Sequence, residues 1–126
     1  MQLELRVLPG EFAVWRLPPD AAMPQIEGGA FLSLTRTPNE VSLVSVADAV
    51  PEGVRAEKGF RCLAVIGPLA FDITGVVAGL SVPLAEAEIP IFVVSTFDTD
   101  YLLVRSQYLD RAIQALTNAG FRITGQ

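Results

Sequence analysis

Two apolar runs on either side of a polar turn constrain this chain more than any other feature. Residues 91–94 (Ile-Phe-Val-Val) and 101–104 (Tyr-Leu-Leu-Val) are short and rich in β-branched and aromatic side chains. Such runs favour strands that are buried on both faces. Five of the six residues between them, 95–100, carry a hydroxyl or a carboxylate. These side chains either converge on a polar ligand or complete the turn of a hairpin, and the residues alone leave both readings open.

The composition indicates one folded domain or two very small ones. The chain has 126 residues, of which 51% are hydrophobic, and this is enough to form a core. No apolar run approaches the roughly 20 residues that a membrane-spanning helix needs. The first residues lack the basic segment and apolar block of a signal peptide. We therefore expect a cytoplasmic protein with no membrane partner.

Charge and residue usage exclude several classes of function. Fourteen acidic residues outnumber nine basic ones, and the basic residues are scattered, so nucleic acid is not an expected partner. The chain has no histidine, and Cys62, its one cysteine, lies in an apolar run typical of a buried, inert thiol. Asp98 and Asp100 are too few carboxylates to predict a metal site. The sequence thus predicts no catalytic residues, no metal and no cofactor, and the protein is not expected to be an enzyme.

The first half of the chain consists of strand patterns. Residues 3–8 and 11–17, separated by Pro9-Gly10, predict one hairpin, and residues 31–36 and 41–46 predict another. The stretch 47–58 carries Pro51, Gly53 and several charges, which predicts a linker. We therefore divide the chain into modules at residues 1–58 and 59–126.

The second half mixes strand and helix patterns. A strand over 59–67 precedes an apolar helical pattern over 73–87, for which Asp72 is placed as the N-cap. The two central strands follow, then a helix capped by Ser106 and a closing strand over 121–124. The order βαββαβ predicts a ferredoxin-like layout, a four-stranded antiparallel sheet with both helices on one face.

The two halves of the chain also resemble each other in sequence, and we call this similarity the echo. Residues 31–45 align with residues 91–105 at an offset of 60, with Glu40 at the position of Asp100. This echo predicts an α+β fold of two related ferredoxin-like modules, the first with a degraded helix. They would pack with antiparallel sheets in one compact unit, and the crevice between them would suit a small ligand.

Three segments of the chain together resemble the ACT-domain family. They are residues 80–85 (Leu-Ser-Val-Pro-Leu-Ala), 89–92 (Ile-Pro-Ile-Phe) and 95–104 (Ser-Thr-Phe-Asp-Thr-Asp-Tyr-Leu-Leu-Val). Within that family the chain looks like small bacterial tandem-ACT proteins and the related cytosolic arginine sensors. The resemblance implies a regulatory module, usually dimeric, that binds a free amino acid or a similar small zwitterion. It also implies an N-terminal degenerate ACT-like module and a C-terminal ACT module.

The resemblance further implies a ligand site between the start of the first ACT helix and the strand hairpin. The residues it implies are Phe71, Asp72, Ile73, Thr74 and Gly75 at the helix, and Thr96, Phe97 and Asp100 in the hairpin. The stretch around Asp72 departs from the arginine sensors in the placement of its acidic residue, so arginine is not implied as the ligand.

Physical chemistry independently favours such a site. A helix N-terminus offers unpaired N–H groups to a carboxylate, and an aspartate suits an ammonium group. We expect Asp100 to contact the ammonium group of the ligand and regard Asp98 as a turn former. Asp72 is a helix cap, a ligand contact or both. The alternative function is a ligand-free module for protein–protein assembly, with a homodimer as the expected state in either case.

Overall fold

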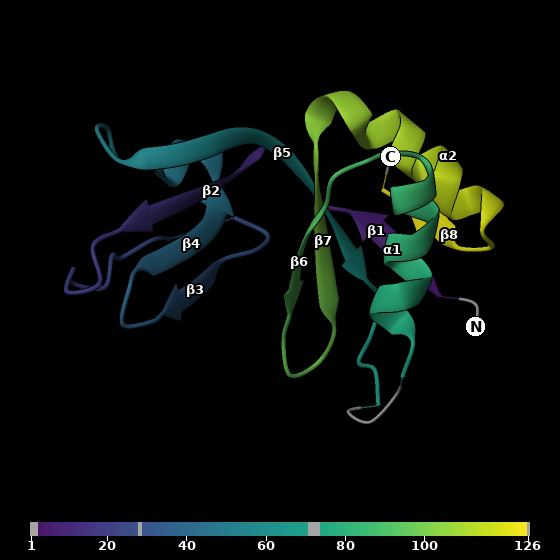
Figure 1. Ribbon diagram of the computed structural model, residues 1–126, viewed down its shortest axis with the longest axis horizontal. Coiled ribbons are helices and arrows are strands. Elements are labelled where there is room, and N and C mark those ends of the chain that lie inside the picture. Colours follow the sequence, from purple (N-terminus) through teal and green to yellow (C-terminus); the bar gives the residue numbers. More distant parts are fainter. Residues whose placement is uncertain (1–2, 28, 71–73, 126) are drawn as a thin grey trace. The chain divides into compact units, whose positions relative to one another are not determined.

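The computed structural model describes residues 3–27, 29–70 and 74–125, which fall into two compact units (Figure 1). Unit 1 combines residues 1–9 with residues 61–126, and unit 2 comprises residues 10–60. The predicted module boundary after residue 58 lies close to the junction after residue 60. The first nine residues, however, group with the C-terminal part of the chain.

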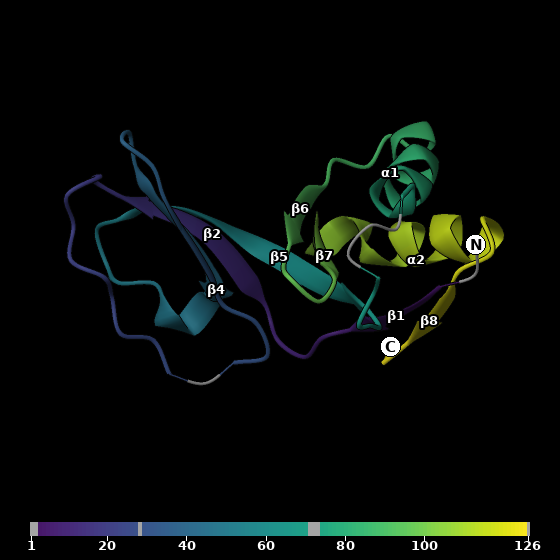
Figure 2. The ribbon, with the colours of Figure 1, turned by 90° about the horizontal axis from the view of Figure 1, so that it is seen from below.

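Unit 1 is a sheet covered on one face by two helices, as Figure 2 shows. Along the sheet its strands lie in the order β6 (Phe92–Ser95), β7 (Asp100–Arg105), β5 (Arg55–Val65), β1 (Glu4–Val7) and β8 (Arg122–Thr124). The helices are α1 (Val76–Glu86) and α2 (Leu109–Asn118), and a 3-10 helix, η2 (Ser106–Tyr108), precedes α2. The predicted α+β class and ferredoxin-like order of β5, α1, β6, β7, α2 and β8 are confirmed.

The first strand corrects two details of the prediction. β1 inserts between β5 and β8, antiparallel to β5 and parallel to β8, so the sheet has five strands rather than four. The predicted hairpin between residues 3–8 and 11–17 is therefore wrong. Leu5 is fully buried and lies in register with Val65 and Ile123. Burial between two strands stabilises β1 more than a local turn at Pro9-Gly10 would.

The core of unit 1 lies between the sheet and the helices. Leu80 and Leu84 of α1 and Leu116 of α2 are almost fully buried against the sheet. Their spacing follows the helical period, so the predicted apolar faces are confirmed at these positions, whereas Val77, also expected on the apolar face of α1, is 41% exposed. The sheet contributes buried side chains from four strands, Leu5, Val7, Leu63, Val65, Leu102, Val104 and Ile123.

Both helix starts differ from the prediction. α1 begins at Val76, with Gly75 as its N-cap residue and no side-chain cap, and the predicted cap Asp72 lies outside the described residues. α2 begins at Leu109 with Tyr108 as N-cap, while Ser106 opens η2 instead of capping the helix. α2 ends just before Gly120, whose left-handed backbone, with φ of +102°, is typical of the residue that follows a helix.

Unit 2 is an antiparallel sheet in the order β3 (Ser33–Arg36), β4 (Val41–Val46), β2 (Phe12–Leu17) and β5, to which β5 contributes residues 55–60. Its described residues include no α-helix, only the 3-10 helix η1 (Ala47–Ala49). Trp15 is 2% exposed and its indole N–H donates to Ser45 Oγ over 2.9 Å, so it is a core anchor. The predicted linker over 47–58 is wrong from Arg55 onward, because β5 begins there.

The central hairpin has two unlike strands. β7 pairs with both β5 and β6, and Leu102, Leu103 and Val104 are buried as predicted. β6 pairs with β7 alone among the described strands, and its Phe92 is 37% exposed. The prediction that both strands are buried on both faces is therefore wrong for β6, which lies at the sheet edge.

Candidate functional site

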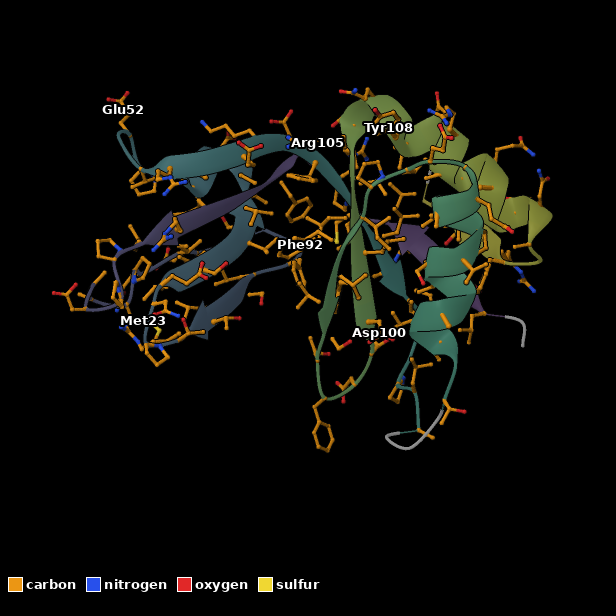
Figure 3. The ribbon with its side chains drawn as sticks, viewed as in Figure 1. Met23, Glu52, Phe92, Asp100, Arg105 and Tyr108 are labelled. Atoms are coloured by element: carbon orange, nitrogen blue, oxygen red, sulfur yellow. The ribbon has the colours of Figure 1, made fainter. Side chains whose placement is uncertain are left out.

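A cavity of about 390 Å³ lies in unit 1 between the first turn of α1 and the β6–β7 turn. The loop before α1 supplies part of its wall, and Figure 3 shows Asp100 at the start of β7 on the side of α1. The lining residues are Leu69, Ala70, Gly75, Val76, Val77, Ala78, Ser95, Thr96, Phe97, Asp98, Thr99 and Asp100. The structure thus brings Gly75, at the start of α1, and the predicted hairpin residues Thr96, Phe97 and Asp100 to one cavity.

The helical wall of the cavity is formed by the N-terminal turn of α1. Gly75 has a φ of +83°, a conformation that glycine adopts without strain, and a Cβ there would meet open space. The first hydrogen bond of the helix runs from Gly79 N to Gly75 O over 2.8 Å. The amides of Val76, Val77 and Ala78 precede it and have no partner within the helix. This wall therefore presents N–H donors and a positive partial charge.

The opposite wall is the 96–99 turn, which is held by its own hydrogen bonds. Thr96 N donates to Thr99 O over 2.8 Å, and Thr99 N donates to Thr96 Oγ1 over 3.2 Å. Thr96 Oγ1 also donates to Thr99 O over 3.0 Å. The Thr96 hydroxyl therefore shapes the turn as well as lining the cavity.

The turn is tied to the strand and loop behind it. Thr99 Oγ1 donates to Val65 O over 2.8 Å, and Leu69 N donates to Asp98 O over 2.8 Å. A Cβ on Gly67 would lie 3.1 Å from Leu69 N and from Thr99 Cβ, which is too close for easy accommodation. Glycine at position 67 thus permits the close approach of the loop to the turn, and this approach fixes one side of the cavity.

Asp100 is the half-buried carboxylate of the cavity. Ser95 Oγ donates to its Oδ1 over 2.5 Å across the register pair that closes the hairpin. Over the described parts of the chain, no second side chain hydrogen-bonds this carboxylate. Asp98 also lines the cavity but is exposed at the turn. The cavity therefore combines amide donors on one wall with carboxylates on the other.

The predicted site residues divide into three groups. Gly75, Thr96, Phe97 and Asp100 line the cavity, and Phe97 is 82% exposed at the tip of the hairpin. Thr74 is exposed and is not one of the lining residues. Phe71, Asp72 and Ile73 lie outside the described residues.

Sequence reasoning missed the helical part of the lining. The donors of Val76, Val77 and Ala78 lie beyond the predicted helix start at residue 73. A glycine directly before an unbroken apolar run is the signal that marks this start, because Gly75 supplies the left-handed backbone at the N-cap. Ser95, which donates a hydrogen bond to Asp100, also lines the cavity.

Other chemistry is sparse in the described part of the chain. Burial raises the pKa of Cys62 to about 12, which keeps the thiol protonated and inert, as expected from its apolar surroundings. No group of three or more Cys, Asp or Glu side chains there is arranged to hold a metal ion. Within residues 3–27, 29–70 and 74–125, no helix has the length and apolarity to span a membrane.

Two family models match the chain. The ACT-domain model covers residues 55–118, and a model for a family-specific N-terminal domain covers residues 10–53. The first match includes β5, α1, the cavity hairpin and α2. The chain belongs to the ACT-domain family.

Solved structures share this fold. Protein Atu0741 from Agobacterium tumefaciens is 42% identical, with a TM-score of 0.93 over 100% of this chain and 95% of its own. A protein of unknown function from Vibrio cholerae, described as a possible transport protein, is 18% identical, with a TM-score of 0.72 over 94% of this chain and 90% of its own. The regulatory subunit of aspartate kinase from Thermus thermophilus is 13% identical, with a TM-score of 0.61 over 89% and 93%.

Proposed function

We propose that this protein is a regulatory or sensor module that binds a free amino acid, or a similar small zwitterion, in the cavity between α1 and the β6–β7 turn. The observation that carries the proposal is the pairing of the α1 N-terminus with the Asp100 carboxylate across one cavity. The ligand carboxylate accepts hydrogen bonds from the first amides of α1, and its ammonium group contacts Asp100. A volume of about 390 Å³ is ample for one amino acid.

The side chains of the cavity favour binding over catalysis. Its lining supplies hydroxyls and carboxylates, but no histidine, cysteine or lysine to act as a nucleophile or general base. Membership of the ACT-domain family supports a regulatory role, as does the fold shared with an aspartate kinase regulatory subunit. We therefore propose a non-enzymatic function without a cofactor.

A thermal shift screen tests the binding proposal. Each of the twenty amino acids is added at millimolar concentration, and a ligand that binds only the folded state must raise the melting temperature. Asp100→Asn keeps the size of the side chain and removes its charge, so it should abolish the shift. Asp20→Asn, which removes one charge from an exposed site in unit 2, should leave the shift unchanged. A flat response of the unaltered protein to all twenty amino acids would reject the proposal.

A second candidate function, ligand-free assembly, is favoured by exposed apolar side chains on α1. Val77 is 41% exposed and Val82 is 54% exposed on a helix that carries no charged residue before Glu86. Exposed apolar side chains of this kind are typical of an interface, and a homodimer would cover them. Sedimentation at increasing protein concentration separates the candidates. A constitutive oligomer that Val82→Lys dissociates, with no response to any amino acid, would favour assembly alone.

A further inference from the structure

The sheet of unit 2 has one apolar face and one face that carries charges. Trp15 and Leu43 point to the core, with Ala13 and Val41, and are at most 2% exposed. Since successive side chains of a strand alternate between faces, Arg16, Ser42 and Arg55 lie on the other face. A cavity of about 230 Å³ on this face is lined by Arg16, Glu40, Ser42, Arg55 and Glu57, together with Val14, Trp15 and Ala56.

The strand register places two arginines opposite each other in this cavity. Arg16 pairs in register with Arg55 on β5 and with Ser42 on β4. Directly opposed residues of antiparallel strands have Cβ atoms about 5 Å apart, and like charges at such positions are destabilising. An anion bound between the two guanidinium groups would relieve this repulsion.

In the described part of the chain, the contacts of these two arginines do not neutralise their charges. Arg16 Nη2 donates to the neutral carbonyl of Asn39 over 3.1 Å. Among the described residues, neither Arg16 nor Arg55 forms an ion pair with a carboxylate. Guanidinium forks match the oxygens of a carboxylate, and the Ser42 hydroxyl adds a further polar group to the same cavity.

The acidic side chains narrow the class of ligand. Glu40 and Glu57 line the same cavity, so two negative charges accompany the two positive ones. They would repel a phosphate dianion and attract an ammonium group. We propose that this cavity is a second ligand site, separate from the one beside α1, which takes a small zwitterion. Its carboxylate bridges Arg16 and Arg55, and its ammonium contacts Glu40.

Glycine titration monitored by backbone amide NMR tests the proposal, with acetate and methylammonium as probes of each half of the zwitterion. The amides of β2, β4 and β5 in unit 2 should shift with glycine and bind it at least tenfold more tightly than acetate. The same shifts should occur in Asp100→Asn, where the other cavity has lost its charge. If glycine moves none of these amides, or if acetate binds equally well, the proposal is overturned.

Two variants with matched controls test which charged side chains bind glycine. Arg55→Gln should weaken glycine binding about tenfold or more, the loss expected for one charge-assisted hydrogen bond, whereas Arg6→Gln in β1 should have no effect. Glu40→Gln should weaken glycine but not acetate, whereas Glu52→Gln, at the turn before β5 (Figure 3), should change neither. Equal glycine affinity in Arg55→Gln and the unaltered protein would overturn the proposal.

The melting temperature of the ligand-free Arg55→Gln variant distinguishes a binding arginine from one that only stabilises the sheet. Because the substitution removes repulsion from Arg16, its melting temperature without glycine should equal or exceed that of the unaltered protein. A lower melting temperature would show that Arg55 stabilises the sheet by its own contacts, and would overturn the proposal.

Discussion

The β3–β4 hairpin of unit 2 and the β6–β7 hairpin of unit 1 have the same turn but different surroundings. Each has four residues in the turn, between the register pairs Arg36–Val41 and Ser95–Asp100, which are 59 residues apart (95 − 36 and 100 − 41). In each, the first residue is a threonine whose N–H donates to the carbonyl of the fourth, over 2.9 Å at Thr37 and 2.8 Å at Thr96. The threonine hydroxyl also accepts from the amide of the fourth residue.

The register of the two hairpins changes the alignment of the two halves of the chain. The sequence echo placed Glu40 at the position of Asp100 with an offset of 60, whereas the strand register gives an offset of 59. Val41, which is fully buried, therefore occupies the position of Asp100. One hairpin directs this position into a hydrophobic core, and the other directs it to a cavity beside a helix N-terminus. The turn is thus the same in both hairpins. The residue that follows it, Val41 or Asp100, differs in its surroundings.

Placing the cavity residue in the core should have the largest effect. Val41→Asp buries a carboxylate where no donor is provided, so we expect a loss of about 4 kcal/mol or more in the free energy of unfolding. Urea unfolding followed by the fluorescence of Trp15, the one tryptophan, reports on unit 2. Val41→Ala is the control for lost volume. A similar loss in both variants would show that charge burial is not what separates the two hairpins.

A substitution at Ser45, a buried residue of β4, should have the next largest effect on stability. At an offset of 59, Ser45 corresponds to Val104, and Ser45→Val introduces the residue of the other hairpin. The variant leaves the buried Trp15 N–H without its acceptor, so we expect a loss of about 1–3 kcal/mol. Ser45→Thr retains a hydroxyl and should recover part of the loss. If Ser45→Val is as stable as the unaltered protein, the hydrogen bond contributes little.

Because the two hairpins share this turn, the same substitution should lower the stability of each by a similar amount. Thr37→Val and Thr96→Val each remove the hydroxyl that accepts from the fourth residue, and each should cost about 1 kcal/mol of unfolding free energy. Thermal unfolding of both variants measures the two losses in stability, with Thr117→Val in α2 as a control outside the turns. Widely different losses would indicate that the two turns are stabilised in different ways.

The reverse exchange should have the smallest effect on stability. Asp100→Val places the residue of the β3–β4 hairpin at the cavity, and because Asp100 is only half-buried we expect a change below about 1 kcal/mol. The same variant should lose any amino-acid-dependent rise in melting temperature, since it removes the ammonium partner. A retained rise would mean that the ligand does not contact Asp100.

Local sequence determined the elements whose stability depends on their own pattern. Residues 41–46 were predicted as a strand and form one, and the apolar spacing of both helices matches their buried faces. The polar turn between two apolar runs is likewise the hairpin that the sequence indicates. In these segments the period of the side chains and the chemistry of the turn are sufficient, because both act within a few residues.

Tertiary structure decided the partners of these elements. Residues 3–8 carry the same alternating pattern as a hairpin strand, yet β1 pairs with β5 and β8, because burial of Leu5 depends on strands far along the chain. The exposed edge of β6 and the start of α1 after Gly75 likewise follow from neighbouring strands and backbone geometry. The residue types marked the polar cluster 95–100, and the resemblance to ACT domains implied Thr96, Phe97 and Asp100 as site residues. Only the fold placed Asp100 opposite the amides of α1, because Thr99 and Asp98 tie the turn to β5 and to the loop that leads into the helix.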